Sequence, residues 1–242
     1  MKTSLIITSL LFLLNWQGFT QDNKDIRIPL LGEISPRFTA TSTLGKINFP
    51  DDYFGKWKIL FSHPADFTPV CTSEMIELAS LQQDFKDLNC AIVVVSTDGL
   101  NSHIEWVKSI EGLEYKDHKN IKIEFPLVSD AGLEISKKFG MLHPYSNTTK
   151  DVRGVFIIDP DNKIQAMFFY PSTVGRNVEE IKRTLIALQT HDKDYCLTPA
   201  NWKPGDDVLI PSPASSVDAQ KLRDKKDPDL NEIAWYMWLK KR

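Results

Sequence analysis

Cysteine is scarce in this chain, which carries only three in 242 residues. Cys71, Cys90 and Cys196 are widely separated, and none has a second cysteine or a histidine at metal-ligand spacing. This pattern argues against a structural zinc site. Glu74 stands three residues after Cys71, so a Cys-x-x-Cys dithiol site is absent as well. We expect neither a metal nor another cofactor, and the chain is long enough to bury a core without disulfides.

A charge imbalance is also lacking. Lys and Arg number 29 against 32 Asp and Glu, which gives a formal net charge of −3. Charge this balanced provides no long-range attraction to nucleic acid or to an anionic membrane, so neither is expected as a partner. Aromatic residues make up 10% of the chain and the charge density is ordinary, which argues against intrinsic disorder.

The N-terminal apolar stretch, residues 5–14, is too short to cross a bilayer as a helix, which takes about 20 residues. Lys2 precedes it, and the small residues Gly18 and Thr20 follow in a polar segment. This layout is typical of a secretory signal peptide, so we expect residues 1–20 to be removed and the protein to be exported to a periplasm or secreted. A buried strand or a membrane anchor are the alternatives for this stretch.

Strand and helix patterns alternate along the middle of the chain, which predicts an α/β fold with a mixed central sheet flanked by helices. We expect strands at 57–62, 91–96, 125–128, 154–159 and 166–170. We expect helices at 75–88, 102–110, 133–139 and 177–190. We expect this domain to span 27–190 and a proline-rich extension to span 191–242. The apolar segment 233–239 in that extension suits an arm that packs either on a partner subunit or on its own domain.

The most informative stretch surrounds Cys71, between an expected buried strand and an expected helix. Thr68 suits the N-cap of that helix and Pro69 its first position, so Cys71 falls third. A thiol there faces unpaired backbone N–H groups and the positive end of the helix dipole, which favour the thiolate. Because the thiolate is the nucleophilic form, the pattern indicates a reactive cysteine. The alternative is an inert buried cysteine near a strand end.

The string Ser62-His-Pro-Ala-Asp-Phe-Thr-Pro-Val-Cys71 resembles the active site of the peroxiredoxins, in particular their 1-Cys, peroxiredoxin 6-type subgroup. The segments 153–160, 171–177 and 198–206 resemble further blocks of that subgroup, so the resemblance covers about residues 29–211. It implies a thioredoxin-like fold with a C-terminal extension. It also implies a thiol-dependent peroxidase for hydrogen peroxide and alkyl hydroperoxides, serving antioxidant defence and redox homeostasis.

The resemblance further implies a role for each matching residue. Cys71 would attack the hydroperoxide and become a sulfenic acid. Thr68 would offer its hydroxyl to the peroxide and the thiolate, and Pro64 would shield the sulfenic acid. Arg153 would stabilise the thiolate and polarise the O–O bond, oriented by a further pair of residues, Glu74 and Arg176. His63 would lie beside the pocket, with a hydrogen-bonded core histidine as the alternative.

The remaining cysteines receive different expectations. Cys90 suits a packed core or interface thiol. In 2-Cys relatives a resolving cysteine stands where this chain has Thr198, but Cys196 lies two residues earlier and could resolve Cys71 on a partner subunit. Otherwise an external thiol must reduce Cys71. We expect a homodimer or a higher homo-oligomer.

Two other functions are alternatives to the peroxidase hypothesis. An exported redox sensor or chaperone-like protein would use Cys71 oxidation as a signal, and a structural thioredoxin-like module would not use it at all. The phospholipase activity of some relatives needs a Gly-x-Ser-x-Gly element. The corresponding stretch here, Phe54-Gly-Lys-Trp-Lys, has no serine, so no lipase activity is expected.

Overall fold

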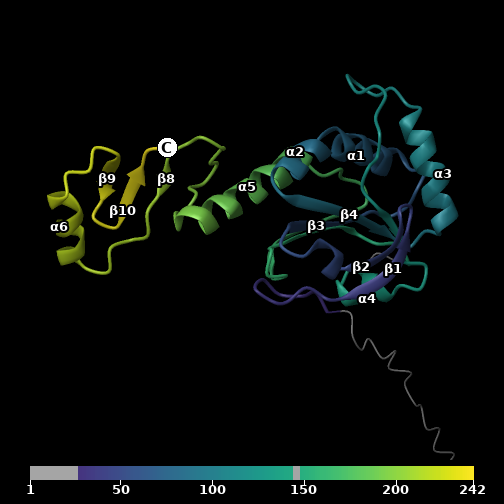
Figure 1. The fold of residues 1–242 in the computed structure, drawn as a ribbon, viewed down its shortest axis with the longest axis horizontal. Helices are drawn as coiled ribbons and strands as arrows, with labels where there is room; N and C mark the ends of the chain where they lie inside the picture. The colour runs from purple at the N-terminus through teal and green to yellow at the C-terminus, as the bar shows by residue number, and fades with distance from the viewer. Residues whose placement is uncertain (1–26, 144–147) are drawn as a thin grey trace, which may run out of the picture.

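The computed structural model describes residues 27–143 and 148–242, and arranges them as a sheet-based domain and a smaller C-terminal part (Figure 1). The expected signal peptide, residues 1–20, lies outside the described residues. Within the described ranges, none of the helices combines the length and the apolar character needed to cross a membrane.

The domain is built on a seven-stranded sheet with the order β2-β1-β5-β4-β3-β6-β7. The central strands β3, β4 and β5 run parallel, and antiparallel pairs extend the sheet on both sides. The strands are β1 (Phe38–Ser42), β2 (Gly45–Phe49), β3 (Trp57–Ser62), β4 (Cys90–Ser96), β5 (Leu127–Ser129), β6 (Arg153–Ile158) and β7 (Ile164–Tyr170). The expected mixed sheet is therefore present, with boundaries shifted by a few residues.

Helices cover both faces of this sheet (Figure 1). They are α1 (Pro69–Ser80), α2 (Gln82–Asp87), α3 (Leu100–Glu111), α4 (Glu134–Lys138) and α5 (Val178–Asp194), with a 3-10 turn, η1, at Asp51–Tyr53. The apolar stripe expected over 75–88 falls on two helices, because Leu81 leaves helical geometry at φ −101° and ψ 2°. Helix α5 continues past residue 190, so the expected domain boundary falls inside a helix.

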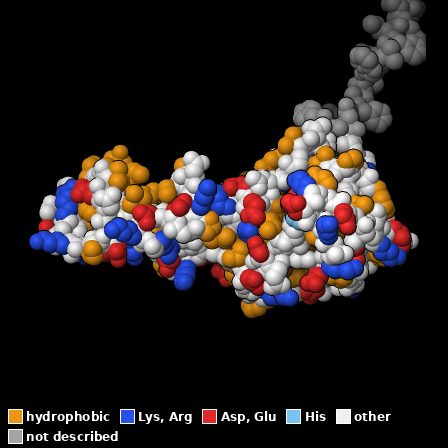
Figure 2. Space-filling view, turned by 90° about the horizontal axis from the view of Figure 1, so that it is seen from above, with side chains coloured by type: hydrophobic (Ala, Val, Ile, Leu, Met, Phe, Trp, Pro, Cys, Tyr) orange, Lys and Arg blue, Asp and Glu red, His pale blue; other side chains and the backbone are white. Residues whose placement is uncertain are grey.

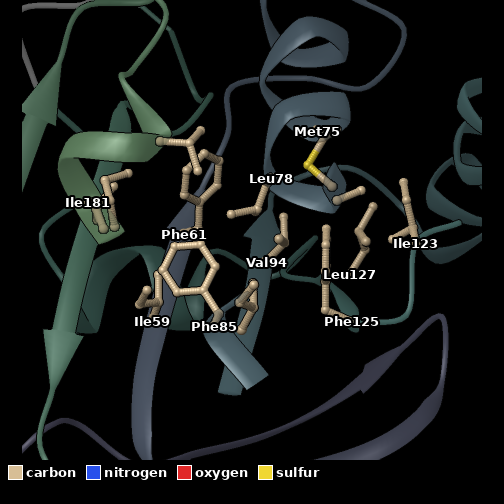
Figure 3. Packing of buried hydrophobic residues seen from close by; sticks show 14 of the residues in the cluster. Ile59, Phe61, Met75, Leu78, Phe85, Val94, Ile123, Phe125, Leu127 and Ile181 are labelled. Atoms are coloured by element: carbon tan, nitrogen blue, oxygen red, sulfur yellow. The ribbon is translucent and has the colours of Figure 1, made fainter. Parts of the chain in front are cut away.

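The alternation of side chains along β3 explains its unbroken apolar sequence. Ile59 and Phe61 join the core beneath α1, α3 and α5, whereas Leu60 joins a second core on the side of α4. Figure 3 shows the first core, with Phe61 between Ile181 of α5 and Leu78 of α1. A strand buried on both faces needs apolar residues at every position, as the sequence suggested.

The C-terminal part begins where α5 ends and carries a separate three-stranded sheet, β8-β10-β9, with α6 packed beside it (Figure 1). Its elements are β8 (Val208–Leu209), α6 (Ser216–Asp224), β9 (Leu230–Ala234) and β10 (Met237–Lys240). Trp238 is buried, but Trp235 and Tyr236 at the hairpin turn are 51% and 56% exposed. Hydrophobic side chains accordingly gather on this end of the molecule (Figure 2). Within one chain, the apolar segment 233–239 thus keeps two aromatic side chains uncovered.

Candidate active site

Cys71 lies in the first turn of α1, as the sequence predicted. Thr68 is extended (φ −110°, ψ 146°) and occupies the N-cap, Pro69 opens the helix, and Cys71 is the third helical residue. The thiol is completely buried. It therefore faces the positive end of the helix dipole in a site from which bulk water is excluded.

Arg153 enters the site from the opposite side, at the first residue of β6. Its Nη1 donates to the Cys71 sulfur at 3.3 Å and to Glu74 Oε2 at 2.7 Å. Its Nε and Nη2 donate to the Ser172 carbonyl at 3.2 and 2.7 Å. The guanidinium plane is thus held on both edges, and one N–H points at the sulfur. Residues 82 positions apart in the sequence meet because α1 packs over the β3–β6 pair.

Glu74 lies one turn after Cys71 and joins Arg153 to Arg176. Arg176 donates from its backbone N and from Nε to Glu74 Oε1, both at 2.8 Å, and from Nη2 to Oε2 at 2.7 Å. Its Nη1 donates to the carbonyls of Ser62 and Gly154, and the guanidinium stacks 3.3 Å above the Phe61 ring. Every guanidinium nitrogen of Arg176 therefore has a partner, which fixes Glu74 and through it Arg153.

The charges of this network support one another. Burial alone would raise the pKa of Glu74, but hydrogen bonds and charge from Arg176, and then the charge of Arg153, hold that pKa below its ordinary value. Burial lowers the pKa of Arg176, and Glu74 partly offsets this. A guanidinium remains charged at neutral pH even so. Two cations around one carboxylate leave a net positive charge facing the Cys71 sulfur.

Thr68 and Pro64 stand in the loop that leads to α1. The Thr68 hydroxyl does not cap the helix; it donates to the Ala65 carbonyl at 2.9 Å. Pro64 is half-buried. Phe67 adopts a left-handed conformation at φ 54° and is 58% exposed. A non-glycine residue in this conformation is strained, and such strain is often found at functional sites.

His63 is completely buried at the end of β3, and its Nε2 lies 2.8 Å from Asp66 Oδ1. Asp66 Oδ2 also lies 2.8 Å from Nδ1 of His103 in α3, a residue that no sequence motif had marked. In the described ranges, His63, Asp66 and His103 form the one cluster with mutual spacing suited to a metal ion. Each of their facing atoms is already engaged in a hydrogen bond within the trio, so we interpret it as a hydrogen-bond network. Nothing in the sequence spacing joins position 66 to position 103.

The other two cysteines lie apart from this site. Cys90 begins β4, and burial raises the pKa of its thiol far above the ordinary value. Cys196 follows α5 and is buried with Trp202 and Val208 in the C-terminal part. Its sulfur lies 3.3 Å from Nη2 of Arg242. All three cysteines are free thiols, and within one chain the structure does not bring Cys196 to Cys71.

Comparison with known proteins identifies the family. The AhpC/TSA family model matches residues 31–167, and the model for the C-terminal domain of 1-Cys peroxiredoxin matches residues 187–226. A peroxiredoxin of Methanosarcina mazei is 48% identical over 215 residues, which cover 88% of this chain and 98% of that protein. The chain belongs to the peroxiredoxin family. A peroxiredoxin of Aquifex aeolicus is 42% identical over 206 residues, covering 81% of this chain and 90% of the relative.

Solved peroxiredoxin structures agree with this result. The yeast mitochondrial 1-Cys peroxiredoxin matches with a TM-score of 0.77 and 37% identity, over 89% of this chain and 100% of that one. Peroxiredoxin 6 of Arenicola marina matches with a TM-score of 0.76 and 32% identity, over 88% and 99%. The expected family and the thioredoxin-like fold are confirmed. The chain is a thiol-dependent peroxidase, an antioxidant oxidoreductase.

Proposed function

We propose that Cys71 is the peroxidatic cysteine and that it reduces hydrogen peroxide and alkyl hydroperoxides. The thiolate attacks the terminal peroxide oxygen, a new S–O bond forms, and the O–O bond breaks. The leaving oxygen keeps the electron pair, takes up a proton and departs as water or an alcohol. Cys71 becomes a sulfenic acid, the first step of cysteine oxidation.

The observation that carries this proposal is the contact between Arg153 Nη1 and the Cys71 sulfur at 3.3 Å. A cation fixed there stabilises the thiolate and stands where negative charge develops on the departing oxygen. Because Glu74 and Ser172 already hold the guanidinium, little reorganisation is needed during the reaction. Arg176 acts indirectly: it orients Glu74, and its own hydrogen bonds go to Glu74 and to the carbonyls of Ser62 and Gly154.

Thr68 and Pro64 complete the proposed site. The Thr68 hydroxyl donates to Ala65 in the resting enzyme, so its oxygen is an acceptor for a hydroperoxide O–H. Rotation of the hydroxyl would let it donate to the thiolate or the peroxide instead. Pro64, half-buried in the same loop, shields the sulfenic acid from a second oxidant molecule. The ring of His63 packs against Trp106, whose indole N–H donates to Thr72 Oγ1 in α1.

We propose that an external thiol recycles Cys71. Cys196 is buried in another part of the chain, and Trp202 and Val208 pack against it. Reaching a sulfenic acid would require that cluster to open and a partner subunit to present Cys196. The yeast relative is described as using glutathione and thioredoxin systems, which makes these thiols the first reductants to test.

A homodimer is supported by two uncovered surfaces. Strand β7 forms an edge of the seven-stranded sheet, pairs with β6 alone among the described strands, and contains no proline. The backbone of Ile164, at the start of this edge, already bonds Gly32 and Glu33, and the rest of the edge presents N–H and C=O groups that a second copy can satisfy. Trp235 and Tyr236 on the C-terminal arm offer a further apolar contact. Light scattering should give twice the chain mass, and Trp235→Ala with Tyr236→Ala should weaken the assembly.

We also propose export, on the basis of the N-terminal sequence. Residues 2–20 combine a basic start, a short apolar run and small residues before the expected cut. N-terminal sequencing of the protein produced in its own host tests this directly. A mature chain that begins near residue 21 supports the proposal, and an intact Met1 in a cytosolic fraction refutes it.

The peroxidase proposal is tested by adding one equivalent of hydrogen peroxide to the reduced protein and measuring its intact mass and its mobility on a non-reducing gel. Cys71→Ser and Cys196→Ser variants run beside it. A gain of one oxygen that depends on Cys71, on a monomeric band, supports a 1-Cys enzyme. A disulfide lost in either variant would make Cys196 the resolving cysteine. No oxidation at Cys71 would refute the proposed role.

A further inference from the structure

Ser62 is the last residue of β3, and its hydroxyl forms two hydrogen bonds across to β6. The hydroxyl donates to the Val152 carbonyl at 2.7 Å and accepts from the Gly154 N–H at 2.9 Å. Ser62 is fully buried, so water does not compete for either bond. These two partners flank Arg153. One side chain therefore holds the backbone on both sides of the arginine that contacts Cys71.

The backbone at Arg153 forms a three-residue turn. The Gly154 N–H also donates to the Val152 carbonyl at 2.9 Å, which is the bond between residues i and i+2 that defines a γ-turn. Regular pairing of β3 with β6 ends just before this turn, at Phe61 and Val155. The side chain that follows Phe61 therefore supplies the link between the two strands beyond their last regular pair.

The Ser62 hydroxyl and the Arg153 side chain lie on opposite faces of the sheet. Val155 belongs to the core beneath α1, and Arg153, two residues earlier on the same strand, points to the same face. Leu60 belongs to the core on the side of α4, and Ser62, two residues later, points to that side. The hydroxyl therefore holds the turn from the face opposite to the Cys71 sulfur.

Glycine at position 154 allows this close contact between a side chain and the turn. A Cβ there would lie 3.1 Å from Ser62 Oγ and 3.5 Å from ring atoms of Phe156 and Phe169. Such a carbon would press the hydroxyl away from the backbone that it binds. The space around the turn is thus matched to a serine on β3 and a glycine on β6.

The carbonyl of Ser62 takes part in the site separately from the hydroxyl. It accepts from Arg176 Nη1 at 2.7 Å, and Arg176 in turn binds Glu74, the partner of Arg153. Replacing Ser62 by alanine leaves this carbonyl in place and removes only the hydroxyl. The substitution therefore separates the hold on the Arg153 backbone from the network of charged side chains.

We propose that Ser62 is a positioning residue of the peroxidase site, whose hydroxyl fixes the turn and so sets where the Arg153 guanidinium meets the Cys71 sulfur. The inference rests on the proposed roles of Cys71 and Arg153. Glu74 and Ser172 orient the far end of the arginine side chain, whereas Ser62 fixes the point at which that side chain leaves the backbone. A displacement of about 1 Å in a reactive site can cost about 10²-fold in rate.

The variant Ser62→Ala tests this role through the rate at which hydrogen peroxide oxidises reduced Cys71, followed by stopped-flow tryptophan fluorescence. We expect the second-order rate constant to fall by about 10- to 100-fold. Ser42→Ala is the matched control, because the Ser42 hydroxyl is also buried and also joins a carbonyl to an N–H, those of Gly45 and Leu44. The control should keep the wild-type rate. A Ser62→Ala rate equal to that of the control would overturn the inference.

A double-variant cycle separates positioning from a general loosening of the fold. If Ser62 acts through Arg153, then Ser62→Ala should slow the reaction far less in the Arg153→Lys background than in the wild type. A structural role alone would lower the free energy of unfolding and leave the rate of the folded protein unchanged. The same fold-change in both backgrounds would show that the effect does not pass through Arg153, and would refute the proposal.

Gly154→Ala probes the same contact and provides the test if Ser62→Ala does not fold. It keeps the hydroxyl but presses it away from the turn, so Cys71 oxidation should slow in this variant too. An unchanged rate in folded Gly154→Ala would contradict the inference. If wild-type Cys71 is not oxidised, or if Arg153→Lys is as fast as the wild type, the proposed function itself fails. A slow Arg153→Lys beside a fast Ser62→Ala refutes the role of Ser62 alone.

Discussion

Asp151 is a buried carboxylate whose two oxygens accept no hydrogen bond from any of the described residues. The Ser136 hydroxyl is close, but it already donates to Asp130 Oδ2 at 2.6 Å. Burial, together with the charges of Asp130 and Asp98, raises the pKa of Asp151 from 3.8 to about 7, and the nearby Ser136 hydroxyl and Lys150 only partly offset this. Replacing Asp151 by asparagine should therefore stabilise the protein where the carboxylate is ionised.

The magnitude follows from the linkage between proton binding and folding. The folded state holds a proton that the unfolded state loses at lower pH, so the stability contributed by protonated Asp151 is fully present below pH 3.8 and declines until the pH passes about 7. At about 1.36 kcal/mol for each pH unit, ionisation costs about 4 kcal/mol above pH 7. The asparagine amide is itself left partly unpaired, at a cost of about 1–3 kcal/mol.

Urea unfolding of both proteins, followed by circular dichroism between pH 5 and 8, measures the difference. The free energy of unfolding of Asp151→Asn minus that of the wild type should increase by about 2 to 3 kcal/mol as the pH rises from 5 to 7.5. Asp161→Asn, at an exposed turn residue, controls for the loss of one negative charge. A constant difference across this range would show that Asp151 is not ionised at a cost in the folded state, and would refute the reasoning.

Three further predictions concern the cysteines and the arginine network. Arg153→Lys keeps the charge but loses the fixed fork, so kcat/KM for hydrogen peroxide should fall about 10²- to 10³-fold; an unchanged value in steady-state assays would contradict the role given to Arg153. Glu74→Gln leaves two buried cations without their carboxylate and should lower the free energy of unfolding by about 3–5 kcal/mol in urea titrations. A much smaller change would show that this ion network does not stabilise the fold. Cys90 should resist iodoacetamide in the native enzyme because burial raises the pKa of its thiol, and Cys90→Ala should retain peroxidase turnover; rapid labelling at Cys90 would count against this.

The sequence alone determined the local features of the protein. The unbroken apolar runs at 57–62 and 91–96 predicted strands buried on both faces, because alternate side chains enter the two cores. Thr68 and Pro69 predicted where α1 begins, and this placed Cys71 in its first turn. Such features depend on neighbouring residues, so short-range patterns are enough to recognise them.

The tertiary structure alone decided which distant residues meet. The Arg153 N–H reaches the Cys71 sulfur because β6 pairs beside β3 beneath α1, a placement that the strand patterns leave open. The resemblance to the family suggested this pair, but nothing suggested that Asp66 would join His63 to His103 or that Asp151 would be buried without a partner. These arrangements depend on the packing of whole elements, since burial and electrostatic neighbours are fixed only when the sheet and helices assemble.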